Sequence, residues 1–128
     1  MSPIRYGYHR QLQPPAPFVN VTLRHPFSGA TVRDFPSQVD CGADRTVLPE
    51  ELAQALGLPQ VGTLGIAGLG GGIQSMHSFA VLLGIHDLPL QPVEVVTSTG
   101  EEWILLGRDV LNAHRILLDG PRLALEIS

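Results

Sequence analysis

Asp40-Cys41-Gly42-Ala43 places a carboxylate, a thiol and a conformationally free glycine in four consecutive residues. A carboxylate can take a proton from water, and two carboxylates held close together share one proton because like charges at short range do not both ionise. The thiol of Cys41 could attack a substrate with help from a distant histidine, but no local signature of such a site surrounds it. An aspartate before glycine can also simply cap backbone groups in a turn. The segment therefore offers a catalytic carboxylate and a structural alternative.

Strand-like segments and short helical segments surround this motif. Apolar alternation and β-branched residues predict strands, and proline, acidic residues and glycine at the right places predict two short helices. Asp119-Gly120 between two apolar runs is a strong hairpin signal. The strands are expected over 18–24, 30–35, 73–85, 93–98, 103–106, 115–118 and 122–127, and the helices over 48–56 and 108–113.

Five residues form the centre of a glycine-rich stretch between two strand-like runs, namely Gly68, Leu69, Gly70, Gly71 and Gly72. Two strands joined by glycines predict a hairpin. A nucleotide-binding loop is excluded because the stretch fails the last position of G-x-G-x-x-G and no Gly-Lys-Ser/Thr follows.

The order of these motifs resembles that of the retropepsin-like aspartic peptidases. That family has apolar–Asp–Thr/Ser–Gly–Ala early in the chain and apolar–apolar–Gly–Arg–Asp/Asn–apolar–Leu near its end, which here read 39–43 and 105–111. Any one motif is weak, but the ordered set at workable spacing is considerably more specific. The resemblance covers about residues 18–127 and is nearer to cellular and bacterial members than to viral ones.

The resemblance implies an all-β fold, a closed barrel with a glycine-rich flap hairpin and one or two short helices. It implies a domain over 18–128, preceded by a proline-rich arm over 1–17. The enzyme would be an aspartic endopeptidase in which two chains of a homodimer each supply Asp40. Cys41, Gly42 and Ala43 would form the active-site loop, Asp44 and Arg108 would form a buried or half-buried ion pair that braces it, and the hairpin over 68–72 would close on a polypeptide substrate.

Cys41 departs from the family, which has Thr or Ser at this position to bond the partner's backbone. A thiol is a weaker hydrogen-bond partner, so a catalytically degenerate dimerisation or peptide-binding module is the alternative. We also expect the terminal strand, residues 123–127, to pair with the partner's edge.

Composition and charge limit the partners. The net charge is −4, and no cluster of Lys and Arg provides the basic face that nucleic acid requires. The longest apolar run is too short to cross a membrane. The single cysteine cannot form an internal disulfide, so a cytoplasmic location is the default. Neither a cofactor nor a metal is implied, because the five histidines show no ligand spacing.

Overall fold

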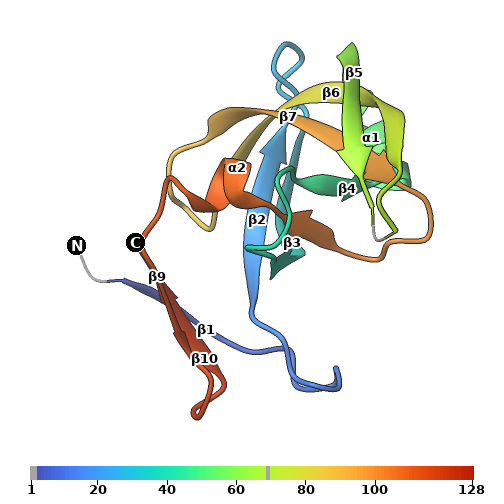
Figure 1. Ribbon diagram of the computed structural model, residues 1–128. Coiled ribbons are helices and arrows are strands. Elements are labelled where there is room, and N and C mark those ends of the chain that lie inside the picture. The colour runs from blue at the N-terminus through green and yellow to red at the C-terminus, as the bar shows by residue number, and fades with distance from the viewer. Residues whose placement is uncertain (1–2, 69) are drawn as a thin grey trace.

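The computed structural model describes residues 3–68 and 70–128 (Figure 1). Within these residues lie ten strands and two short helices, in a mostly β arrangement. In chain order they are β1 (Ile4–Gly7), β2 (Phe18–Arg24), β3 (Thr31–Val39), β4 (Val47–Pro49), α1 (Glu50–Leu56), β5 (Gln60–Ala67), β6 (Ile73–Ile85), β7 (Gln91–Ser98), β8 (Ile104–Leu106), α2 (Arg108–Leu111), β9 (Ile116–Asp119) and β10 (Ala124–Ile127).

Six strands close into a barrel. Hydrogen-bonded neighbours follow the order β2-β3-β8-β4-β7-β6, and a further pairing of β2 with β6 joins the two ends of this row. Closure leaves the row without a free edge. β5 lies outside the closed row and pairs with β6 as a long hairpin. The all-β closed barrel with a glycine-rich hairpin and two short helices is therefore confirmed.

Period-two alternation explains the barrel core. In β2 the side chains of Val19, Val21 and Leu23 are almost fully buried, whereas the residues between them are partly exposed. Such alternation is what a strand with one face on the core requires. The predicted strand over 73–85 is β6 with the same bounds, and its buried end packs against β2.

β3 continues past its predicted end through Pro36 to Val39. The N–H of Val39 donates to the carbonyl of Pro17, and the antiparallel alternation then turns the nitrogen of Pro36 away from β2. On that other side, pairing with β8 begins only at Ser37. Pro36 is tolerated because its missing N–H faces no partner strand, and β3 therefore delivers Asp40 directly from a strand end.

A second sheet of three strands, in the order β1-β10-β9, stands beside the barrel and carries both ends of the described chain (Figure 1). Leu125 and Ile127 of β10 belong to the same buried hydrophobic cluster as the barrel core. β10 is bonded on one side to β1 and on the other to β9. The expectation that residues 123–127 pair with a partner's edge is wrong, because both edges of β10 are already occupied within the chain.

The two described helices have seven and four residues, and neither has the length and apolar character that crossing a bilayer requires. α1 begins with two glutamates, which suit the positive end of the helix dipole. It ends at Gly57, whose φ of 63° is the left-handed conformation that terminates many helices.

Candidate active site

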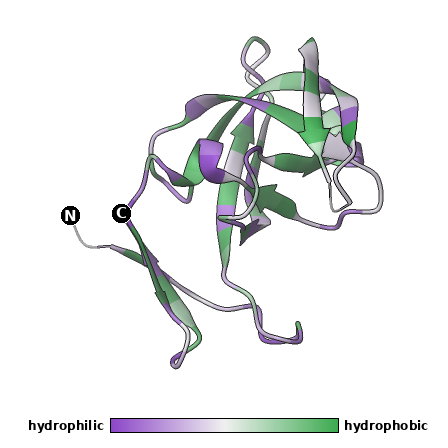
Figure 2. Cartoon of the chain, viewed as in Figure 1, coloured by the Kyte–Doolittle hydropathy of each residue, from purple (hydrophilic) through white to green (hydrophobic). Residues whose placement is uncertain are grey.

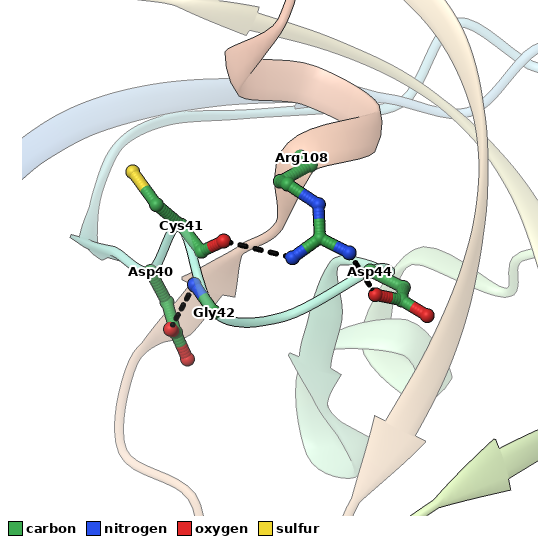
Figure 3. Close-up of polar contacts among 5 residues, drawn as sticks. All are labelled: Asp40, Cys41, Gly42, Asp44 and Arg108. Carbon is green, nitrogen blue, oxygen red and sulfur yellow. Dashed lines mark hydrogen bonds and ion pairs between the residues drawn. The ribbon is translucent and has the colours of Figure 1, made fainter.

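Asp40 stands at the first turn after β3. Its Oδ1 accepts a hydrogen bond from the N–H of Gly42 at 3.1 Å (Figure 3). Its carbonyl accepts one from the N–H of Ala43 at 3.2 Å. A Cβ at position 42 would lie 3.3 Å from that same Oδ1, so glycine lets the backbone approach the carboxylate. Among the described residues, the second carboxylate oxygen has no hydrogen-bond partner. One oxygen is fixed by the turn and the other remains available for chemistry.

The turn rests on β8, a strand far along the chain. β3 and β8 run parallel, with Val39 opposite Leu106. The N–H of Asp40 donates to the carbonyl of Leu106 at 3.0 Å, and the N–H of Arg108 donates to the carbonyl of Ala43 at 2.9 Å. These two bonds hold both ends of the 40–43 turn against the same short segment, so the carboxylate is positioned by backbone rather than by flexible side chains.

The guanidinium of Arg108 bridges two parts of the loop (Figure 3). Nη1 donates to the carbonyl of Cys41 at 2.9 Å, and Nη2 donates to Oδ1 of Asp44. The side chains of Arg108 and Asp44 are 45% and 79% exposed, so the pair is more exposed than the sequence analysis expected. An exposed ion pair contributes little to stability by itself. Its effect is local, because one arginine ties the residue after Asp40 to the far end of the turn.

A buried network, which the sequence analysis did not identify, lies beneath this loop. The hydroxyl of Thr46 donates to Oδ1 of Asp109 at 2.7 Å and accepts from the N–H of Gly107 at 3.1 Å. The N–H of Thr46 donates to Oδ2 of the same aspartate at 3.0 Å. Thr46 is fully buried. Both oxygens of Asp109 thus fasten the segment that follows the Asp40 turn to α2.

We expect Thr46→Val to lower the free energy of unfolding by about 2–3 kcal/mol, because valine has nearly the same shape but leaves a carboxylate oxygen and a buried N–H unpaired. Chemical denaturation measures this change. Thr46→Ser keeps the hydroxyl and is the matched control, with an expected loss of about 1 kcal/mol or less. Equal losses for the two variants would show that the hydroxyl does not carry the effect.

The glycine-rich hairpin lies across a cleft from the loop that follows Asp40. β5 and β6 pair along their length, from Gln60 opposite Phe79 to Ala67 opposite Ile73. At the tip the N–H of Gly68 donates to the carbonyl of Gly72 at 3.2 Å. Gly70 and Gly71 have φ of 102° and 84°, a conformation that favours glycine. Leu69 lies outside the described residues.

A cleft of about 500 Å³ separates the loop that follows Asp40 from the hairpin. Its floor is residues 42–45 with Val47, its roof is residues 64–67 of β5, and Val96 closes one side. Except for Asp44 and Arg45, these residues are glycine or apolar, so the cleft presents both apolar side chains and polar backbone to a ligand.

Two other candidates give no separate site. Cys41 is an unpaired, exposed thiol, and Figure 3 shows its sulfur pointing away from Arg108. Within residues 3–68 and 70–128, no three His, Cys, Asp or Glu side chains gather as a metal-binding set.

Comparison with known protein families shows which family this chain belongs to. The family described as "gag-polyprotein putative aspartyl protease" matches residues 30–113, which is more than half of the chain. This chain belongs to that family. The matched range contains the Asp40 turn, the glycine-rich hairpin and the Gly107–Asp109 segment. A search of curated protein sequences found no match.

Solved structures of this aspartyl protease type share the fold. A retropepsin-like aspartic protease from Rickettsia conorii has a TM-score of 0.65 at 16% identity, over 98% of this chain and 88% of that one. The simian foamy virus protease has a TM-score of 0.53 at 17% identity, over 75% and 92%. The EIAV protease, in a complex with the inhibitor HBY-793, has 0.53 at 21% identity, over 77% and 86%. At these identities the comparison establishes the fold.

Proposed function

We propose that this chain is an aspartic endopeptidase that acts as a homodimer, with one Asp40 carboxylate from each subunit. The observation that supports this proposal most strongly is the position of Asp40. The residue follows the end of a strand beside a cleft, and its carboxylate accepts a hydrogen bond from a backbone N–H. Membership of an aspartyl protease family supports the same assignment.

The chemistry requires two carboxylates. One must take a proton from water to make it nucleophilic, and the other must donate a hydrogen bond to the substrate carbonyl. Each chain has one aspartate in this setting, since Asp44 pairs with Arg108 and Asp109 is used by Thr46. A two-fold axis beside Asp40 would bring a second copy of the same turn to the site.

The substrate in this proposal is an extended polypeptide. Leu64 and Ile66 of the hairpin face Ala43 and Val47 across the cleft, which gives apolar walls for a substrate side chain. An extended peptide can also pair its backbone with protein strands on either side. The hairpin would act as a flap that closes over the peptide and excludes water, with the glycines at its tip providing freedom to move.

No cofactor or metal takes part in this mechanism. A cytoplasmic location suits a chain whose only cysteine makes no disulfide. Cys41 also supports the alternative, a degenerate dimerisation or peptide-binding module, because a thiol is a poor substitute for the hydroxyl that the family has there.

We expect cleavage of members of a diverse peptide library, because a pair of carboxylates can both activate a water and hydrogen-bond the scissile carbonyl. A peptide mimic whose hydroxyl replaces the attacking water should inhibit, and metal chelators should not. Mass spectrometry of the library gives both the activity and the preferred side chains. Binding of the mimic without any cleavage would favour the degenerate module, and loss of activity with a chelator would contradict the metal-free mechanism.

We expect Cys41→Thr to tighten the dimer by about tenfold or more, because each of two threonine hydroxyls can gain a backbone hydrogen bond worth about 1 kcal/mol across the two-fold axis. Sedimentation under reducing conditions measures the dissociation constant. Cys41→Ala is the control and should loosen the dimer without changing the fold. An unchanged or weaker dimer in the threonine variant would show that the thiol is adapted to its place.

A further inference from the structure

Two charged residues, Asp44 and Arg45, line the cleft between the loop that follows Asp40 and the hairpin, within the part of the chain that the structure describes. The remaining residues of its lining are glycine or apolar. Figure 2 shows hydrophobic to neutral residues along most of β4 and β5, which border the cleft. A partly enclosed charge is screened less by salt than a charge on an open surface. The charges of Asp44 and Arg45 therefore influence which ligand charges the cleft accepts.

The two charged side chains differ in whether they already have partners. The carboxylate of Asp44 is paired with Arg108, as Figure 3 shows. The guanidinium of Arg45 forms neither an ion pair nor a hydrogen bond within residues 3–68 and 70–128. One negative and two positive side chains leave an excess of positive charge beside the floor of the cleft. Arg45 is thus a cation whose donors remain free for a ligand.

The loop holds Arg45 so that its side chain lies on the cleft side. The next residue, Thr46, is fully buried and turns its hydroxyl toward the interior. Successive side chains of an extended segment point to opposite faces, so Arg45 and Val47 lie on the other face, and both line the cleft. On the inner side, the backbone of Arg45 packs against Gly107, where an added Cβ would lie 2.6 Å from the carbonyl carbon of Arg45. Close packing of this backbone fixes the place from which the arginine reaches a ligand.

We propose that Arg45 selects polypeptide substrates that carry a glutamate or aspartate within a few residues of the scissile bond. This inference rests on the proposed function and names the substrate class of that site. A guanidinium donates two parallel hydrogen bonds to a carboxylate, which an uncharged side chain does not match. A basic substrate side chain is not favoured, because Arg45 repels it and Arg108 already occupies the carboxylate of Asp44. Leu64 and Ile66 on the hairpin accept an apolar side chain of the same peptide, so substrates combine an acidic residue with an apolar one.

The homodimer makes this preference two-sided. Each subunit contributes one Arg45, and the two-fold axis places the two copies on opposite sides of the scissile bond. An extended peptide that crosses the axis meets both copies, because its residues continue in both directions at about 3.3 Å each. We therefore expect an acidic residue to be favoured at one position before the scissile bond and at one position after it.

Matched peptides measure the preference. In a peptide that the wild-type protein cleaves, each position near the scissile bond is replaced in turn by Glu, Gln or Lys. At one position on each side, Glu should raise kcat/KM about fivefold over Gln, because the two side chains have nearly the same shape and differ in charge. Lys should lower kcat/KM at the same two positions. The advantage of Glu should shrink in about 1 M salt, where the screening length falls to about 3 Å.

Variants of Arg45 assign the preference to this residue. Arg45→Gln should abolish the advantage of the Glu peptide over the Gln peptide, and Arg45→Glu should reverse it so that Lys is favoured. Arg45→Lys keeps the charge without the planar fork and should retain part of the advantage. Arg33→Glu, the same charge reversal at an exposed position of β3 outside the cleft, is the control and should leave the ratio of the Glu and Gln rates unchanged. Thermal unfolding checks that each variant is folded.

Binding measurements separate this inference from the proposed function. Asp40→Asn, which we expect to be inactive, should bind a labelled Glu peptide about fivefold more tightly than the matched Gln peptide, as measured by fluorescence anisotropy. A Glu preference in binding, lost in Arg45→Gln, without hydrolysis by the wild type would keep the role of Arg45 and remove the proposed function.

Hydrolysis with equal rates for Glu, Gln and Lys peptides would overturn the inference and leave the proposed function standing. A Glu preference that survives Arg45→Gln would have the same consequence. A preference for Lys would assign the specificity to Asp44 and overturn the inference as well. If no peptide were either bound or hydrolysed, both the inference and the proposed function would fall.

Discussion

Asp40→Asn should lower the rate of peptide hydrolysis by about 10³-fold or more, because it removes the group that takes the proton from water. The amide oxygen of asparagine can still accept the hydrogen bond from Gly42, so the turn should keep its shape. Thermal unfolding should therefore be unchanged while cleavage is lost. Asp44→Asn, in the same loop but paired with Arg108, is the control and should retain most of the activity.

The same variant tests whether the carboxylates come from two chains. A mixed dimer of wild type and Asp40→Asn has one carboxylate and should be inactive. Adding a large excess of the variant to a fixed amount of wild type should thus suppress activity, by drawing wild-type chains into mixed dimers. Activity that is insensitive to the added variant would mean that a single chain holds the complete site.

Gly107→Ala should lower the free energy of unfolding by about 2–3 kcal/mol, because the new methyl group has no space. A Cβ at this position would lie 2.6 Å from the carbonyl carbon of Arg45 and 2.9 Å from its nitrogen. These are backbone atoms of the loop that follows Asp40, so the loop itself must move. Differential scanning calorimetry should show a melting temperature lower by roughly 10 °C, and peptide hydrolysis should fall in parallel.

Gly7→Ala is the matched control, since nothing lies within 4 Å of its added Cβ. We expect its effect on stability to stay below about 1 kcal/mol. A stable and active Gly107→Ala protein would show that the loop tolerates displacement, which would contradict the close packing of residues 45 and 107 as a requirement for the site.

Helices and strands that have a distinctive pattern within their own residues could be predicted from the sequence. The long strand-like run of β6 after the glycine-rich stretch and the glycine at the end of α1 were sufficient to place both elements. β4 has only three residues, and it exists because β7 and β8 pair with it on either side. β1 likewise depends on β10, at the other end of the chain. Such strands have no period of their own that a single sequence could reveal.

The same limit applies to the site. Asp40, Gly42 and Arg108 belong to short motifs that can be recognised in the sequence. The role of Thr46 could not be predicted from the sequence. Its hydroxyl has a hydrogen-bond partner only because the fold brings Asp109, 63 positions away, next to it. The terminal strand was assigned to the wrong edge for a related reason. Its apolar alternation indicates that one face of the strand is buried. The alternation does not indicate which strands pair with its two edges.

The parallel pairing of β3 with β8 has a consequence for the order in which parts of the chain fold. Thr46 and Asp109 are 63 positions apart, and Cys41 and Arg108 are 67 apart, so fixing the Asp40 turn closes a very long loop. Long-range parallel pairings are slow to form, because the entropy of closure precedes the gain in contacts. We therefore expect the Asp40 turn to acquire its geometry late in folding. A chain still emerging from the ribosome has the aspartate but lacks the strand beneath it, so the turn can take its final shape only after β8 has paired with β3.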